Sequence, residues 1–115
     1  AEELKRNGGK TWVYQFNRVR DDELAQKYGA FHGAELPYVF DTHDQWLPTN
    51  KADKVLTEEI QSYWLSFAKT GDPNNDGAVV WPEYESSNDS TLVLDNEIYQ
   101  RSHESSEICK IMDLF

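Results

Sequence analysis

The chain lacks the features that mark several classes of protein. It has a single cysteine, Cys109, so it cannot close an intrachain disulfide. Cysteine usage therefore does not indicate whether the protein belongs to an oxidising or a reducing compartment. Its eleven basic residues are outnumbered by twenty-one acidic ones, and the net charge of −10 argues against binding to nucleic acid or to an anionic membrane surface. It has no run of about 18 apolar residues, so no membrane span is expected.

Several motifs that carry enzyme chemistry or targeting are also missing. There is no Gly-x-Ser-x-Gly elbow, no His-Glu-x-x-His pair and no Gly-rich phosphate loop, so we expect no cofactor and no metal centre. Residues 1–10 lack the apolar stretch of a signal peptide, and no other targeting signal is recognisable. The compartment, secreted or cytoplasmic, is therefore left open.

Aromatic residues, in contrast, are abundant. They make up 13% of the chain, while the aliphatic residues are sparse. Each aromatic ring hides roughly 150–250 Å² when it packs, so this composition indicates surfaces that are built for burial. A compact domain of this size buries only about 60–70% of its surface. We interpret the surplus rings, with Trp12, Trp64 and Trp81 foremost, as packing surface for sheet and helices outside this chain.

The clearest predicted element is a helix over residues 52–69. Its apolar residues recur at helical spacing on one stripe, which consists of Leu56, Ile60, Tyr63, Trp64 and Phe67. Gly71 and Pro73 follow and end the helix.

The other elements are shorter. We expect a helix end over residues 1–7, an internal strand over 11–16, a loop over 17–35, a short helix over 36–40, loops over 41–50 and 70–90, a strand over 91–95 and a final helix that includes Ile108 and Phe115. Strands that are far apart in sequence, joined by long irregular stretches, do not make an independent sheet. The pattern predicts an α/β fold that is incomplete on its own, with residues 1–115 as one portion of a single domain and no internal boundary.

Residues 72–83 match the calcium-loop pattern. Asp72, Asn74, Asp76 and Glu83 occupy ligand positions, and Gly77 occupies the turn position. A proline directly before Glu83 disagrees with the exit helix of an EF-hand, and Asp, Asn, Pro and Gly are also the residues of an ordinary turn. The turn is the favoured interpretation, and a calcium module stays as a weak alternative.

The three histidines differ in their surroundings. His43 and His103 lie among polar residues, which predicts solvated surface positions for both. His32 lies in a run of small residues, 29–35, between two apolar segments, which is a common setting for a catalytic side chain. On composition alone, a structural role for His32 is still the more frequent outcome.

Two further residues carry possible chemistry. Cys109 lies in a predicted amphipathic helix, where a packed thiol is expected rather than a nucleophile. Asn88-Asp89-Ser90 is an N-glycosylation sequon, which matters only if the protein is secreted, so glycosylation of Asn88 is left open.

The order of several motifs resembles the C-terminal part of the type-B carboxylesterases, a family that includes cholinesterases, bile-salt-activated lipase and bacterial para-nitrobenzyl esterases. The similar segments are collinear over nearly the whole chain: residues 13–16, 29–40, 63–74 (which end in Gly-Asp-Pro-Asn), 81–84 (Trp-Pro-Glu-Tyr), 92–94 and 107–110. Any one of these would be modest evidence, but six in the same order are strong evidence.

This resemblance implies an α/β-hydrolase fold with a triad that runs in the order Ser, Asp/Glu, His. His32 matches the family's catalytic histidine, which acts as general base toward the serine hydroxyl and then as general acid toward the leaving alcohol. Glu35 is only three residues further on and is expected to cap or face the next helix rather than act as the triad acid.

The family's serine elbow, oxyanion-hole glycines and acidic triad member would all lie upstream of residue 1. The implied partner is therefore the N-terminal remainder of the same hydrolase, the implied substrate is a small ester, and the fragment alone is expected to be inactive. The alternative is a non-catalytic adhesion or binding relative, since one fold can serve either purpose.

Overall fold

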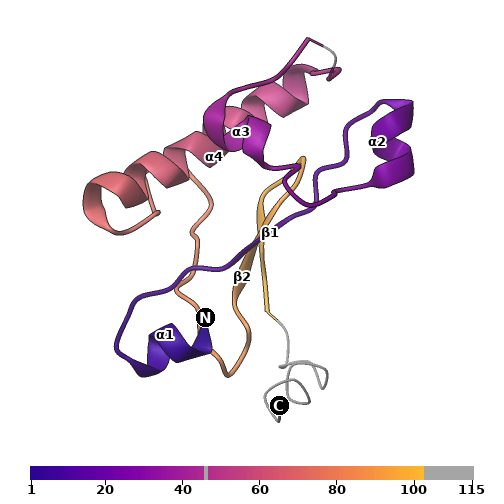
Figure 1. Cartoon of the computed structure of the whole chain (residues 1–115). Coiled ribbons are helices and arrows are strands. Elements are labelled where there is room, and N and C mark those ends of the chain that lie inside the picture. The colour runs from indigo at the N-terminus through magenta and orange to yellow at the C-terminus, as the bar shows by residue number, and fades with distance from the viewer. Residues whose placement is uncertain (46, 103–115) are drawn as a thin grey trace.

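The computed structural model describes residues 1–45 and 47–102. The elements, in chain order, are α1 (Glu2–Arg6), β1 (Tyr14–Phe16), α2 (Glu23–Tyr28), α3 (Leu36–Phe40), α4 (Lys51–Thr70), β2 (Thr91–Leu94) and β3 (Tyr99–Arg101). α3 and α4 lie side by side at one end of the molecule, α1 lies at the other end, and the sheet runs between them (Figure 1). None of the described helices is long and apolar enough to cross a membrane.

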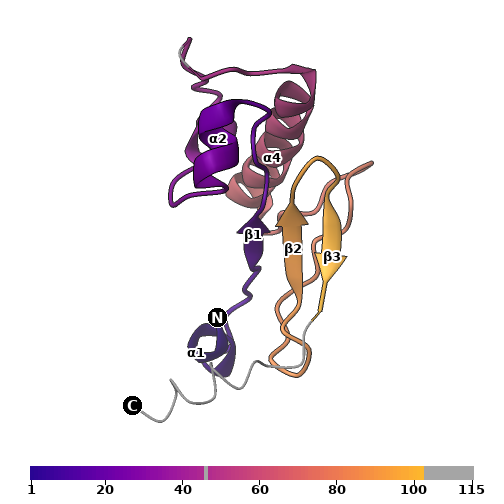
Figure 2. The ribbon, with the colours of Figure 1, turned by 90° about the vertical axis from the view of Figure 1, so that its right-hand side faces the viewer.

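The sheet has three strands in the order β1-β2-β3, as Figure 2 shows. β1 is parallel to β2, with Tyr14 opposite Leu92 and Phe16 opposite Leu94, and β3 is antiparallel to β2. All four residues of the central strand β2 are buried, whereas β1 is mostly exposed. Within the described residues, the second edge of β1 pairs with no strand. The prediction that this segment is an internal strand covered on both faces is therefore not met inside this chain.

Helix α4 confirms the long helix that the apolar stripe predicts. Asn50 and Asp53 form a reciprocal capping box at its start, where the Asn50 side chain accepts from the Asp53 backbone and the Asp53 side chain accepts from the Asn50 backbone. Gly71 ends the helix with φ 78°, a left-handed conformation that glycine adopts without strain. Helix α3, with Pro37 in its first turn, is also confirmed.

The core forms where α3, α4 and β2 meet. It consists of Tyr38, Leu56, Ile60, Tyr63, Trp81, Leu92 and Leu94, all almost fully buried. Trp81 donates its indole N–H to the carbonyl of Val13 (3.0 Å) and thus belongs to this chain's own core. The interpretation of Trp81 as packing surface for an outside element is therefore wrong, although Trp12 and Trp64 are only partly buried.

Two elements differ from the sequence-based expectation. The predicted loop over residues 17–35 contains α2, whose start is capped by the Asp22 carboxylate accepting from Ala25 N (3.0 Å). α2 buries no residue, so it carries no apolar stripe that a pattern could reveal. The strand β3 was likewise not expected. The predicted final helix with Ile108, Cys109 and Phe115 lies outside the described residues.

Candidate functional site

His32 lies on an exposed turn between α2 and α3. The turn is held by its own backbone, because Phe31 N donates to Gly29 O (3.1 Å) and Ala34 N donates to Phe31 O (3.0 Å). Gly29 and Gly33 have φ values of 65° and 84°, which L side chains rarely adopt. No hydrogen bond or ion pair is formed by the His32 side chain with the part of the chain that the structure describes. Its imidazole is therefore presented to solvent without an orienting partner.

A cavity of about 460 Å³ lies beside this turn. Its wall is mostly apolar and includes Leu24 and Tyr28 of α2, Phe31 and Gly33 of the turn, and Leu36 of α3. Several of these side chains are more than half exposed elsewhere on their surface, among them Phe31 at 55%. The turn therefore combines a free imidazole with an apolar hollow next to it.

Glu35 closes the turn and begins α3. Its backbone carbonyl accepts from Tyr38 N (2.9 Å) and Val39 N (3.1 Å), and its side chain makes no helix cap. Burial, and to a smaller extent the nearby Glu35 carboxylate, raise the pKa of Tyr14. The Glu35 carboxylate thus lies near Tyr14 of β1, and the expectation that it caps α3 is not met.

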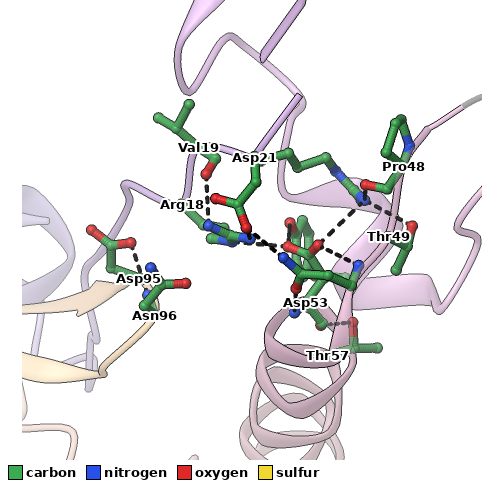
Figure 3. Close-up of polar contacts among 12 residues, drawn as sticks. Arg18, Val19, Asp21, Pro48, Thr49, Asp53, Thr57, Asp95 and Asn96 are labelled. Atoms are coloured by element: carbon green, nitrogen blue, oxygen red, sulfur yellow. Dashed lines mark hydrogen bonds and ion pairs between the residues drawn. The ribbon is translucent and has the colours of Figure 1, made fainter. Parts of the chain in front are cut away.

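The most strongly connected polar group is Asp53, at the start of α4 (Figure 3). Its Oδ1 accepts from Arg18 Nε (2.8 Å) and from the Tyr38 hydroxyl (2.7 Å), and its Oδ2 accepts from Asn50 N (2.9 Å). Arg20 Nη1 lies 4.0 Å from the same Oδ2. We call Asp53, Arg18, Arg20 and Tyr38 the anchor cluster. All four are buried.

The charges of the anchor cluster support one another. Burial alone would raise the pKa of Asp53, but Arg18, the Asn50 N–H and the Tyr38 hydroxyl outweigh it and hold that pKa below its ordinary value of 3.8. Burial, and then the bond to Asp53, raise the pKa of Tyr38. The carboxylate is therefore ionised and the phenol neutral at physiological pH.

His43 lies at the edge of this cluster and is half-buried. Arg20 Nη2 is 2.8 Å from His43 Nδ1, and His43 Nε2 is 2.7 Å from Thr57 Oγ1. Because a guanidinium only donates, Nδ1 must accept, and the proton is therefore on Nε2. Thr57 Oγ1 accepts it and donates to the Asp53 carbonyl (2.7 Å). The prediction that His43 is a solvated surface residue is therefore wrong, while His103 lies outside the described residues.

The anchor cluster could not be foreseen from local sequence patterns. Arg18 and Asp53 lie 35 positions apart, and no local spacing connects them. The Asn50-x-x-Asp53 capping pattern was the one available signal, and it indicates a helix start without revealing the buried arginine.

The side chains of the candidate calcium loop have other partners. The Asp72 carboxylate accepts from the backbone and side-chain N–H groups of Asn74 (2.9 Å each), as in an Asx turn. The Asn74 side chain donates from Nδ2 to the Trp81 carbonyl and accepts at Oδ1 from Trp81 N. The Glu83 carboxylate forms an ion pair with Lys5 (2.7 Å). No group of three potential metal ligands occurs among residues 1–45 and 47–102. Asp76 is exposed, and the turn interpretation accounts for this segment.

The sequon residues lie in the turn that precedes β2. Asn88 is exposed, and the buried Ser90 donates its hydroxyl to the Asn88 side-chain oxygen. The thiol of Cys109 lies outside the described residues.

Comparison with known proteins gives one consistent result. The family model described as the carboxylesterase family matches residues 1–111. The para-nitrobenzyl esterase of Bacillus subtilis is 40% identical over 101 residues, which cover 84% of this chain and 20% of that protein. Acetylcholinesterase 1 of Caenorhabditis elegans is 35% identical over 89 residues, which cover 70% of this chain and 14% of that protein.

Solved structures agree. A thermophilic PNB esterase superposes with a TM-score of 0.76 at 34% identity, and the match covers 93% of this chain and 22% of the esterase. A further structure of PNB esterase gives a TM-score of 0.78 at 33% identity, covering 96% of this chain and 23% of the esterase. The chain thus spans about a fifth of the length of these relatives, and it folds as part of an α/β-hydrolase does.

Proposed function

The chain belongs to the carboxylesterase family, and we propose that it is the C-terminal segment of a serine esterase, to which it contributes the catalytic histidine, His32. The complete protein would hydrolyse small carboxylic esters. Its serine nucleophile, oxyanion hole and acidic triad member would come from the N-terminal remainder. The chain alone would be inactive, because it carries one member of three.

The observation that carries this proposal is the position of His32. It lies on an exposed, hydrogen-bonded turn bounded by glycines, beside an apolar cavity, and without an orienting partner among the described residues. A catalytic imidazole needs one nitrogen free for the nucleophile and the other held by an acid. Within residues 1–45 and 47–102, neither group contacts His32, which is the situation expected when both belong to another segment.

In the complete enzyme, the neutral imidazole of His32 would accept the proton of the serine hydroxyl as the oxygen attacks the ester carbonyl. It would then give that proton to the departing alkoxide and repeat the cycle with water. An imidazole suits both transfers because its ordinary pKa, about 6.5, lies close to neutral pH. The apolar cavity next to the turn would take an apolar part of the ester.

A second set of observations supports an N-terminal partner. Four aromatic side chains that are exposed or half-buried gather along β1 and α4, and we call them the aromatic surface: Trp12, Tyr14, Trp64 and Phe67. They line a cavity of about 300 Å³. Next to it, Thr11 Oγ1 and Trp12 Nε1 are buried and have no hydrogen-bond partner within residues 1–45 and 47–102. Buried polar atoms in native proteins are almost always satisfied.

The shape of the chain agrees with an incomplete unit. Its radius of gyration is 15.6 Å, whereas a compact domain of this length has about 13 Å. Together with the unpaired edge of β1, this extended shape is what a segment of a larger sheet would have.

The proposal is tested by complementation. The chain is combined with a polypeptide that carries the remainder of the hydrolase with its Gly-x-Ser-x-Gly elbow, and hydrolysis of para-nitrophenyl acetate is followed. We expect neither part alone to hydrolyse the ester and the pair to do so, with a loss of about 10⁴-fold or more in His32→Ala. Glu35→Gln is the matched control and should leave the rate near that of the wild type.

A complemented pair in which His32→Ala hydrolyses as fast as the wild type contradicts the catalytic assignment. A remainder that folds with the chain but has no serine at the elbow would instead support the adhesion or binding alternative.

A further inference from the structure

Hydrogen bonds within the anchor cluster hold both ends of the segment that carries His32. Arg18 follows β1 and precedes that segment, and Tyr38 in α3 follows it; both bond the same carboxylate oxygen, Asp53 Oδ1 (2.8 and 2.7 Å). Residues 19–37 are therefore closed into a loop whose two ends meet at one buried atom. A loop with fixed ends explores less space than one with free ends.

Backbone hydrogen bonds connect α3 directly to the turn that carries His32. Tyr38 N donates to Glu35 O (2.9 Å), Leu36 N to Gly33 O (3.1 Å) and Ala34 N to Phe31 O (3.0 Å). These successive turns form one hydrogen-bonded run from residue 31 to residue 38, and His32 lies inside it. A shift of Tyr38 would therefore move the imidazole.

The Tyr38 ring is held as firmly as its hydroxyl. Phe16 of β1 lies 5.1 Å from it between ring centroids, the Arg20 guanidinium lies 5.0 Å above it, and the His43 ring meets its edge at 5.0 Å. Only 1% of Tyr38 is exposed. The ring is thus fixed by packing, and the hydroxyl sets its final position against Asp53.

The two oxygens of Asp53 have separate tasks. Oδ2 caps α4 through Asn50 N, whereas Oδ1 receives both bonds from the ends of the His32 segment. Helix capping alone needs only the first of these. The second, with a buried arginine and a buried phenol on one oxygen, exceeds what a cap requires.

We propose that Asp53 is a positioning residue for His32: its Oδ1 fixes the distance between Arg18 and Tyr38 and so the place of the catalytic imidazole. This inference rests on the proposed function. It needs a carboxylate, because Arg18, Tyr38, Asn50 and Arg20 all face Asp53 with donors. An asparagine would have to turn its NH₂ group toward one of these donors.

The test uses the complete hydrolase and compares two phenol deletions. Tyr38→Phe removes the hydroxyl that bonds Asp53, and Tyr63→Phe removes the hydroxyl of an equally buried tyrosine, which bonds the Val79 carbonyl (2.6 Å) and not the anchor cluster. Since a misplacement of about 1 Å can cost about 100-fold in rate, we expect kcat for para-nitrophenyl acetate to fall about 10-fold in Tyr38→Phe and about 100-fold in Asp53→Asn. KM should change little in either, and Tyr63→Phe should keep the wild-type kcat.

Each outcome decides something different. If His32→Ala abolishes hydrolysis while Tyr38→Phe and Asp53→Asn keep the wild-type kcat, the positioning role is overturned and the proposed function stands. If Tyr38→Phe and Tyr63→Phe lower kcat equally, the effect is one of general stability, and the positioning role is again overturned. If His32→Ala is fully active, the proposed function itself fails. Should Asp53→Asn not fold, the comparison of Tyr38→Phe with Tyr63→Phe still supports or overturns the positioning role.

Discussion

The two ends of α4 are built in opposite ways. At its first turn, Asp53 is fully buried, and its carboxylate accepts from donors of this chain. Toward its last turns, Phe67 is 51% exposed, and the partly buried Trp64 packs against the core, with the rings of Tyr14 and Trp81 beside it (ring centroids 5.2 and 5.7 Å). One end is complete within the chain, while the other presents rings with nothing over them in the part of the chain that the structure describes.

This difference separates what the chain does for itself from what it offers to a partner. Polar groups in a low-dielectric interior must be satisfied locally, and the anchor cluster satisfies them with side chains from α3, α4 and the segment that follows β1. Apolar rings can stay exposed to solvent until a partner binds. Covering a half-exposed ring then contributes roughly 2 kcal/mol to the free energy of binding. The contacts of the anchor cluster are therefore made within this chain, whereas the aromatic surface is available to a partner.

The largest effect is expected from a substitution in the anchor cluster, at the first turn of α4. Asp53→Ala leaves the buried Arg18 with only the exposed Asp21 (3.5 Å) as a counter-charge, so the free energy of unfolding of the complete hydrolase should fall by roughly 3 kcal/mol. Urea denaturation followed by tryptophan fluorescence measures it. Asp76→Ala, on the exposed turn, should change it by less than about 0.5 kcal/mol. Equal effects of the two substitutions would mean that the anchor cluster is not a stabilising centre.

The second largest effect is expected from a substitution in the aromatic surface, toward the last turns of α4. Phe67→Ser removes a ring from the aromatic surface, and since interface anchors contribute about 2 kcal/mol, recovery of hydrolysis by complementation should need about 30-fold more of the N-terminal polypeptide. Leu65→Ser is the matched control, because Leu65 is 58% exposed and lies on the opposite side of α4. A titration in which both variants behave alike would show that the aromatic surface faces solvent in the complete protein.

A smaller effect is expected on the stability of the protein at low pH. Because the pKa of Asp53 is lowered in the folded state, its contribution to stability is present above the ordinary value of 3.8 and is lost as the pH falls through the lowered pKa. The urea midpoint of the complete hydrolase should therefore decline steeply below about pH 4, and less steeply in Asp53→Asn. Identical slopes in the two proteins would contradict the buried ion pair with Arg18.

Elements with local signals were predictable from the sequence. Helix α4 carries an apolar stripe and a glycine stop, and α3 carries Pro37 in its first turn, so spacing and end signals were enough. α2 was missed because it buries no residue, and β3 because its pairing with β2 and its exposed residues produce no alternation. Patterns reveal elements in proportion to how much apolar surface they bury.

The candidate site divides in the same way. His32 is proposed as a site residue through the resemblance to the carboxylesterases, while composition alone favours a structural histidine. The anchor cluster was not found, because ion pairs between distant residues leave no periodicity. His43 was misjudged for this reason: its sequence neighbours are polar, but its contacts are with Arg20 and Thr57, which come from other segments.

The smallest expected effect lies at the rim of the anchor cluster. Burial and the Arg20 guanidinium lower the pKa of His43, with Lys54 acting in the same direction and Asp41 and Asp53 opposing it. A histidine whose folded pKa is lowered takes up its proton more readily when unfolded. Its contribution is therefore complete above the ordinary value of 6.5 and is lost as the pH falls through the lowered pKa.

This loss has a structural cause that can be tested. A proton on His43 Nδ1 would face the donating Arg20 Nη2 at 2.8 Å, so the two groups would separate. The melting temperature of the complete hydrolase should fall between about pH 7.5 and about pH 5.5, and part of this fall should vanish in His43→Gln. If His43→Gln kept the whole of the wild-type pH dependence, the acid-sensitive contact would lie elsewhere in the protein and not beside the anchor cluster.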